Sequence, residues 1–176
     1  MIRTADLSDQ FFKDLPAVAS TLGVSLEHLL EVMNFESGVY ASAQNATTGA
    51  TGLIQFMPAT LRGMGYTKGY SEFRKLRAEE QLPYVKRYLS PYAGKMTSLE
   101  AAYLAVFLPA YIPQASDPDF ILARATSIIA KSNPALRGPD GSIQVKNLAP
   151  AIKRQQKSAR WLEILYRAGL FTGPLP

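Results

Sequence analysis

The chain has 176 residues, of which 47% are hydrophobic and 19% are charged, and this balance excludes an intrinsically disordered chain. It has no cysteine, which excludes disulfide frameworks, thiolate metal sites and cysteine nucleophiles. The net charge is +5, and the whole excess lies in residues 142–176. The length predicts a single domain, residues 1–176, whose core is large enough to be stable without metal or disulfides.

The first part of the chain is predicted to be helical around one glycine-rich loop. The helices have apolar residues at helical spacing or begin at a proline, and they cover residues 8–22, 25–37 and 58–63. The first starts at Ser8 and stops before Gly23. Residues 38–56 are rich in glycine, threonine and asparagine, and they predict a loop with a short strand or hairpin around 49–52.

The second part is also predicted to be helical. The expected helices cover residues 71–94, 98–110, 117–131 and 145–168. The helix over 98–110 is apolar nearly all round, which predicts a buried central helix. A loop with a turn at Asp140-Gly141 precedes the last helix. Because no multi-strand pattern occurs, the expected fold class is mostly α.

Glu36 is the only acidic residue in the stretch 34–58. It falls on the last turn of the helix over 25–37, at the edge of the apolar stripe and near the negative end of the helix. Both surroundings disfavour the charged form and raise the pKa of a carboxyl group. A protonated carboxylic acid can serve as a general acid in glycosidic cleavage. On spacing alone, the alternative is an ordinary exposed glutamate.

The residues after Glu36 strengthen the catalytic interpretation. "ESGVYASAQNATTGATGLIQFMPAT" (36–60) resembles the signature of soluble lytic transglycosylases (SLT) of the lysozyme superfamily. Two later stretches of this chain, "AEEQLPYVKRYLSPY" (78–92) and "LEAAYLAVFLPAYI" (99–112), resemble the segments that follow this signature in the family. "NPALRGPDGSIQVKNL" (133–148) is similar to the end of phage endolysin or virion-associated lysin domains. The resemblance covers about residues 20–150, so residues 142–176 are expected to form a basic helical extension.

The resemblance implies a lysozyme-like fold, with a glycine-rich loop or small β-hairpin beside an active-site cleft. It implies that Glu36 first acts as an acid on the bond between N-acetylmuramic acid and N-acetylglucosamine in peptidoglycan. The same residue then acts as a base on the 6-hydroxyl of the sugar, which gives a 1,6-anhydro product. Because the substrate carries the nucleophile, one carboxylate suffices, and we expect no cofactor and no metal.

The same resemblance assigns substrate-binding residues. Gln55 matches a glutamine that contacts substrate, Met57 a methionine beside the cleft, and Tyr103 a tyrosine next to the catalytic acid. The other residues expected to bind substrate are Ser37, Asn45, Thr48, Gly52, Phe56 and Tyr111. The family asparagine after the tyrosine is replaced by Leu104. A serine often stands in the loop of the family, and which of Asn45, Thr47 and Thr48 takes its role stays open.

Two other functions of the same fold remain open. A lysozyme-type hydrolase would use Glu36 with water as the nucleophile, and it would need a positioned water or a second acid. Candidates for that acid are Glu72, Glu79, Glu80, Asp117 and Asp119. For Glu79 and Glu80, an ion pair with Arg77 or a solvated helix face is the simpler interpretation. The second alternative is a non-catalytic module that binds the cell wall or builds a virion.

The basic extension suggests a polyanionic partner. On one continuous helix, Lys153, Arg154, Lys157 and Arg160 would share a face opposite Trp161. No nucleic-acid motif accompanies them, so we expect anionic envelope polymers and no nucleic acid as the partner. The simpler alternative is that the extension docks Trp161 on the core.

Sequence patterns also give an expected location. No apolar run reaches the length of about 18 residues that a membrane span needs, and the N-terminus lacks the hydrophobic core of a signal peptide. We therefore expect no transmembrane segment and no signal peptide. The expected protein is a monomer that is made in the host cytoplasm and acts on the cell wall or periplasm, or is carried in a virion.

Overall fold

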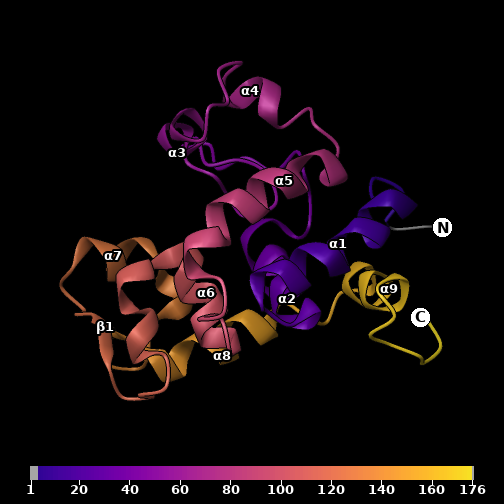
Figure 1. Ribbon diagram of the computed structural model, residues 1–176. Coiled ribbons are helices and arrows are strands. Elements are labelled where there is room, and N and C mark those ends of the chain that lie inside the picture. Colours follow the sequence, from indigo (N-terminus) through magenta and orange to yellow (C-terminus); the bar gives the residue numbers. More distant parts are fainter. Residues whose placement is uncertain (1–3, 176) are drawn as a thin grey trace.

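The chain folds mainly into α-helices, which confirms the expected mostly α class (Figure 1). The computed structural model describes residues 4–175. The α-helices are α1 (Asp9–Leu22), α2 (Leu26–Ser37), α3 (Pro58–Gly63), α4 (Tyr70–Phe73), α5 (Ala78–Leu89), α6 (Leu99–Phe107), α7 (Ile128–Ser132), α8 (Val145–Arg154) and α9 (Ala159–Arg167). The 3-10 helices are η1 (Ser90–Tyr92), η2 (Pro109–Gln114) and η3 (Pro134–Leu136), and the strands are β1 (Ile121–Ala123) and β2 (Ile143–Gln144).

Local caps fix the ends of α1 and α2, and both helices confirm the sequence prediction. The hydroxyl groups of Ser8 and Ser25 each accept a hydrogen bond from a backbone N–H in the first turn of their helix. The helices end at Gly23 and Gly38, whose φ values of 63° and 65° lie in the left-handed region that glycine adopts readily. The second cap determines where the last turn of α2 lies.

Helix packing places α2 inside the molecule. It contacts α1, α6 and α8, and its residues Leu30 and Met33 are fully buried. These side chains belong to one hydrophobic cluster that extends from Leu7 to Ile164. Since each fully buried side chain of this size contributes about 1.5–3 kcal/mol to folding, a displacement of α2 would expose a costly apolar surface.

The most apolar helix is α6, which confirms the expected buried central helix. Ser98 caps it by accepting a hydrogen bond from the Ala101 N–H at 3.1 Å, and most of its residues are buried. Its length of 9 residues is less than half of what a bilayer requires. Within residues 4–175, no helix combines the length and the apolar character of a membrane span.

The glycine-rich loop between α2 and α3 is ordered without forming a regular hairpin. Two isolated bridges pair Gln44 with Thr51 and Thr51 with Phe56. The Thr51 and Phe56 backbones exchange hydrogen bonds of 3.0 and 2.8 Å. The chain therefore turns back on itself at 51–56, close to the position expected for a hairpin.

The helix predicted over 117–131 is wrong. Residues 121–123 form β1, which pairs antiparallel with β2, and α7 begins only at Ile128. Ser127 is the actual cap, because its hydroxyl accepts a hydrogen bond from the Ala130 N–H at 3.1 Å. Pairing with a strand later in the chain thus overrides the helical pattern, as is common for short apolar runs.

The continuous helix predicted over 145–168 is also wrong, because the chain breaks into α8 and α9. Ile152 and Trp161 are both buried. On one helix they would be about 180° apart, so both could not face the core. The break solves this conflict, and Ser158 caps the second helix through the Trp161 N–H at 3.1 Å. The expected helix over 71–94 is divided in the same way into α4, α5 and η1.

Candidate active site

Glu36 lies on the last turn of α2, and its side chain is half-buried. Burial raises the pKa of its carboxyl group to about 7, and a hydrogen bond from Tyr103 opposes this rise. A carboxyl group with this pKa exists in both protonation states at neutral pH. It can therefore give a proton to a substrate and take one back.

Tyr103 on α6 donates a hydrogen bond to Glu36, and its ring belongs to a buried aromatic cluster. Its ring packs edge-on against Phe35 at 5.2 Å between centroids and stacks on Phe107 at 5.4 Å. Only 2% of the residue is exposed. Burial, together with the nearby Glu36 charge, raises the pKa of the Tyr103 phenol well above its ordinary value. The phenol therefore keeps its proton and donates a hydrogen bond to the Glu36 carboxylate.

A cavity of about 60 Å³ lies between the glycine-rich loop and α5. Gln55, Phe56 and Met57 line it together with Tyr88 of α5. The pKa of Tyr88 is raised by burial first and then by the charges of Tyr92 and Glu36, so this wall of the cavity is within electrostatic reach of the acid. The sequence interpretation missed Tyr88, although a tyrosine three residues after the buried Val85 of α5 is a signal for a half-buried ring.

The three loop residues in this cavity differ in what they can do. Met57 is 46% exposed, so its side chain is free to contact a ligand. Gln55 has a φ of 53°, which is rare outside glycine, and its side-chain amide donates to the Gly52 carbonyl at 3.2 Å. Phe56 is buried against Phe73 and Tyr88, so packing explains it without a ligand.

The buried amide of Gln81 on α5 holds the glycine-rich loop in place. Its oxygen accepts from the Leu53 N–H at 3.0 Å, and its nitrogen donates to the Ala41 carbonyl at 2.8 Å. A Cβ on Gly52 would lie 2.5 Å from the Gln81 oxygen, so this glycine is required for close approach. Gly52 thus shapes the loop. Sequence reasoning missed Gln81, which could have been found as the polar residue on the apolar face of α5.

Ser37 joins the loop to α2. Its hydroxyl lies 2.9 Å from the Leu53 carbonyl and 3.0 Å from the Met33 carbonyl, and it can donate to either. Leu53 is therefore held from both sides, by Ser37 through its carbonyl and by Gln81 through its N–H. These contacts set the distance between the loop and Glu36.

Asn45 and Thr48 occupy the exposed tip of the loop. The Asn45 side-chain oxygen accepts hydrogen bonds from the Thr47 and Thr48 N–H groups, at 2.9 and 3.1 Å. The Thr48 hydroxyl accepts from the Ala50 N–H at 3.2 Å. Such contacts stabilise a turn. The structure does not bring these side chains to the cavity between the loop and α5, since the residues that line it start at Ile54.

Tyr111 lies apart from the other expected site residues. Its ring packs at 5.6 Å against Phe120, and it lines a separate hollow of about 370 Å³ with β1 and the start of α7. The structure therefore groups Glu36, Tyr103, Gln55, Phe56 and Met57, with Ser37 and Gly52 behind them.

The five acidic residues considered as a second acid have other partners. Ion pairs join Glu72 to Lys75, Glu79 and Glu80 to Arg77, and Asp119 to Lys146, and Asp117 accepts a hydrogen bond from the Asp119 N–H. This confirms the ion pairs expected for Glu79 and Glu80. Among residues 4–175, no carboxylate contributes to the pKa shift of Glu36.

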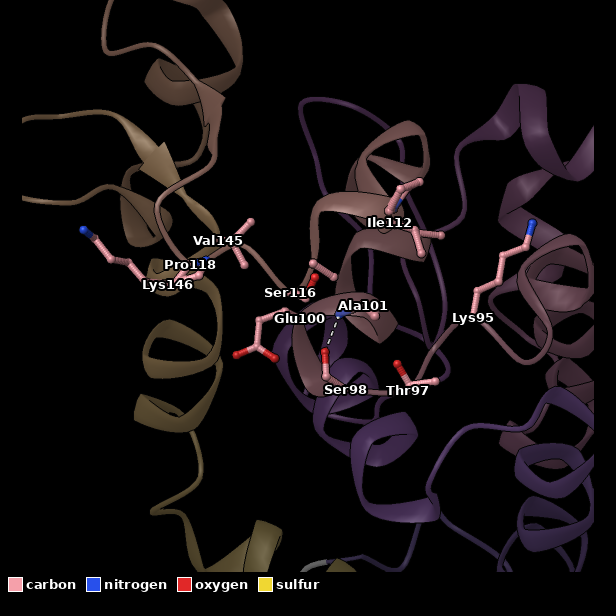
Figure 2. Close-up of a pocket in the computed structure, with 12 residues that line it drawn as sticks. Lys95, Thr97, Ser98, Glu100, Ala101, Ile112, Ser116, Pro118, Val145 and Lys146 are labelled. Carbon is pink, nitrogen blue, oxygen red and sulfur yellow. Dashed lines mark hydrogen bonds between the residues drawn. The ribbon is translucent and has the colours of Figure 1, made fainter.

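A larger hollow lies elsewhere, at the start of α6 (Figure 2). Its volume is about 510 Å³, and Lys95, Glu100 and Lys146 stand around it. None of the site residues expected from the sequence lines this hollow. Volume alone therefore does not identify the site. We place the site at Glu36, because the pKa of its carboxyl group is raised and Tyr103 donates a hydrogen bond to it.

Comparison with known proteins identifies the family of the region that contains Glu36. A family model described as "Transglycosylase SLT domain" matches residues 17–105, which include α2, the glycine-rich loop and Tyr103. Everything from the last residues of α6 onward lies beyond the match. A search of curated proteins gives no match to the chain.

Replacing Glu36 with Gln should stabilise the protein at high pH. The carboxyl group has a pKa of about 7 in the folded chain against an ordinary value of 4.5, so the folded state binds its proton more tightly. The wild type therefore loses stability as the pH rises between these values, by about 3 kcal/mol in full. Urea unfolding should show this gain near pH 8 and none near pH 4. Equal gains at both pH values would contradict the assignment.

Replacing Tyr103 with Phe should raise the pKa of Glu36 further, because the hydrogen bond from Tyr103 lowers it. The titration of the Glu36 carboxyl carbon, followed by NMR, measures the change directly. Tyr111→Phe is the matched control, since Tyr111 lines another hollow. A fall in the Glu36 pKa in Tyr103→Phe would show that the hydroxyl group has a different role.

Proposed function

We propose a specific reaction for this chain, which belongs to the transglycosylase SLT domain family. In this proposal it cleaves the β-1,4 bond between N-acetylmuramic acid and N-acetylglucosamine and forms a 1,6-anhydro product. Family membership by itself gives a peptidoglycan lytic transglycosylase-type enzyme with a lysozyme-like fold. The specific bond follows from the family resemblance, and one observation supports the anhydro product. Glu36 is a half-buried acid with a pKa of about 7, and no second carboxylate of residues 4–175 acts on it.

In the proposed reaction, the Glu36 carboxyl group gives its proton to the glycosidic oxygen as the bond from that oxygen to C1 of the muramic acid breaks. Positive charge then develops at C1, and the negatively charged carboxylate formed at Glu36 stabilises it. The 6-hydroxyl group of the same sugar attacks C1 and transfers its proton to Glu36. The acid is regenerated, and no water is consumed.

Tyr103 supports this exchange by donating its hydrogen bond to the Glu36 carboxylate. The bond stabilises the anion between the two proton transfers and keeps the pKa from rising above the range in which both states are populated. Met57 and Gln55 line the cavity between the glycine-rich loop and α5. We assign them to the glycan, with the exposed thioether of Met57 against a sugar face.

The biological setting that we propose is bacterial lysis or phage entry. The support is the resemblance of residues 133–148 to phage-type domains. In this setting the protein is made in the host cytoplasm and reaches the cell wall as a free endolysin or within a virion. Mass spectrometry of purified virions separates the two, because only a virion component is found in the particle.

The exposed basic residues at the end of α8 are a proposed contact for anionic envelope polymers. Lys153, Arg154 and Lys157 are exposed. Arg160 no longer belongs to this set, because its side chain is only 11% exposed and pairs with Asp6. The proposed contact is thus smaller than the continuous helical face expected from the sequence.

Digestion of purified peptidoglycan should yield muropeptides with 1,6-anhydro ends, which mass spectrometry distinguishes from reducing ends by the mass of one water. Reducing ends would mean that water takes the place of the sugar hydroxyl, and the protein would be a lysozyme-type hydrolase.

Glu36→Gln should lower the rate of peptidoglycan cleavage by at least about 100-fold, because the proton donor is lost. Wall binding by the variant, measured in a pull-down with purified cell walls, should stay unchanged. If the variant cleaves as fast as the wild type, Glu36 is not the acid. If the wild type binds walls without cleaving them, the protein is a binding module.

Charge reversal of Lys153, Arg154 and Lys157 to Glu should weaken binding to anionic cell walls and reduce its dependence on salt. The residues are exposed, so stability should change little. Lys131→Glu, at an exposed lysine of α7, serves as the control. Unchanged salt-dependent binding in the triple variant would leave the extension with a docking role only.

A further inference from the structure

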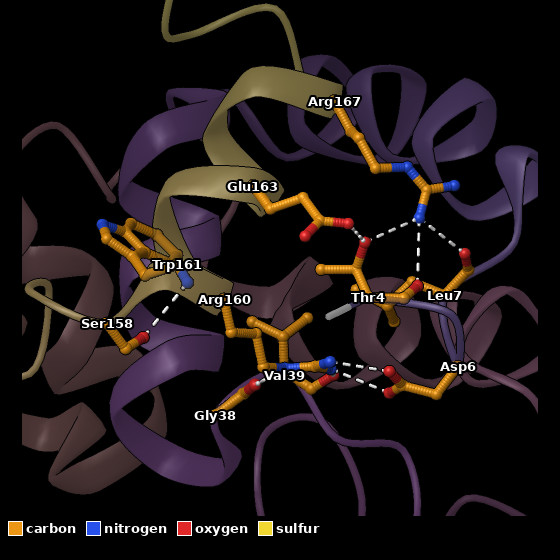
Figure 3. Close-up of polar contacts among 10 residues, drawn as sticks. All are labelled: Thr4, Asp6, Leu7, Gly38, Val39, Ser158, Arg160, Trp161, Glu163 and Arg167. Atoms are coloured by element: carbon orange, nitrogen blue, oxygen red, sulfur yellow. Dashed lines mark hydrogen bonds and ion pairs between the residues drawn. The ribbon is translucent and has the colours of Figure 1, made fainter. Parts of the chain in front are cut away.

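Arg160 of α9 is tied to the end of α2 (Figure 3). Its guanidinium group donates from Nε to the Gly38 carbonyl at 3.2 Å and from Nη2 to the Val39 carbonyl at 3.1 Å. It also forms a two-pronged ion pair with Asp6, at 2.6 and 2.8 Å, and lies 3.7 Å from the centre of the Tyr40 ring. One side chain from near the C-terminus thus holds the turn that ends α2.

That turn contains a backbone conformation that is rare for its residue type. Val39 has a φ of 57°, and a β-branched residue seldom adopts a positive φ. Its side chain is fully buried, and its carbonyl accepts the hydrogen bond from Arg160. Such conformations persist only where the surrounding contacts hold them. Here the core holds the side chain and the guanidinium group holds the carbonyl.

We propose that Arg160 is a positioning residue for Glu36, an inference that rests on the proposed function of Glu36 as the catalytic acid. Glu36 lies two residues before Gly38, in a helical turn whose Asn34 and Met33 carbonyls accept hydrogen bonds from the Gly38 and Val39 N–H groups. Arg160 holds these two capping residues through their own carbonyls. With Arg160 in place, the turn is fixed and the carboxyl group stays half-buried against Tyr103. Without it, the turn loosens and water reaches the carboxyl group.

The helix that carries Arg160 is itself anchored. Trp161 is buried, and the Thr4 hydroxyl donates to the Glu163 carboxylate at 2.7 Å. Arg167 donates to the carbonyls of Thr4 and Leu7 at 3.0 and 2.9 Å (Figure 3). The family match ends at residue 105, so this support for Glu36 comes from a part of the chain outside the matched region.

Arg160→Gln tests the proposal, with Arg167→Gln as the matched control. Both residues lie on α9, bind backbone carbonyls, pair with an aspartate and lie over an aromatic ring. The contacts of Arg167 are to residues 4–12, away from the end of α2. The readouts are the NMR titration of Glu36, and kcat and KM on a soluble muropeptide oligomer.

In Arg160→Gln, the pKa of Glu36 should fall from about 7 toward 4.5, because water stabilises the carboxylate. The kcat should fall about tenfold or more while KM stays within about twofold, since only the placement of the acid changes. Arg167→Gln should lower the stability of the protein but leave the pKa of Glu36 and the kcat unchanged. Arg160→Lys should recover part of kcat, because lysine restores the charge opposite Asp6 without the planar fork.

An Arg160→Gln variant with an unchanged pKa and an unchanged kcat would overturn the proposal and leave Arg160 a purely structural role. If this variant does not fold, Arg160→Lys carries the same test, and an unchanged pKa and kcat there overturn the proposal as well. The titration does not depend on activity. A wild type that fails to cleave peptidoglycan therefore refutes the proposed function, while the pKa still shows whether Arg160 positions Glu36.

Discussion

The buried amide of Gln81 is the contact on which the geometry of the site depends. The glycine-rich loop buries Leu53, Ile54 and Phe56 in the core, and hydrogen bonds in a region that water does not reach fix the position of its backbone. Gln81 supplies them to Leu53 and Ala41, and Ser37 adds one from α2. The amide makes no contact with the acid, yet it determines where the loop stands relative to Glu36.

The parts of the fold that sequence predicts well are those that local chemistry decides. A serine cap precedes α1 and α2, and a left-handed glycine follows each of them. Because these signals are local, the sequence predicts both helices correctly. Where distant contacts decide, the pattern misleads. The strand at 121–123 exists because it finds β2, and the break before Ser158 exists because two apolar faces must both reach the core.

The same division applies to the site. The family signature predicts Glu36 and Tyr103 as site residues, and these two residues of different helices share a hydrogen bond in the structure. It does not indicate that Ser37 and Gly52 serve the loop, nor that Tyr111 lies against another hollow. Arg160 could not be found from sequence, because its partners are more than 120 residues away and its charge suggested a surface role.

The junction of Asp6, Gly38 and Arg160 has a consequence for the order of folding. It joins residues separated by as many as 154 positions, so closing it requires a loop that contains most of the chain. Contacts of such separation form late, and during synthesis α9 leaves the ribosome after α1 to α8. The turn after Glu36 is therefore completed only when α9 has emerged, and a nascent or truncated chain without α9 lacks the contacts of Arg160 to that turn.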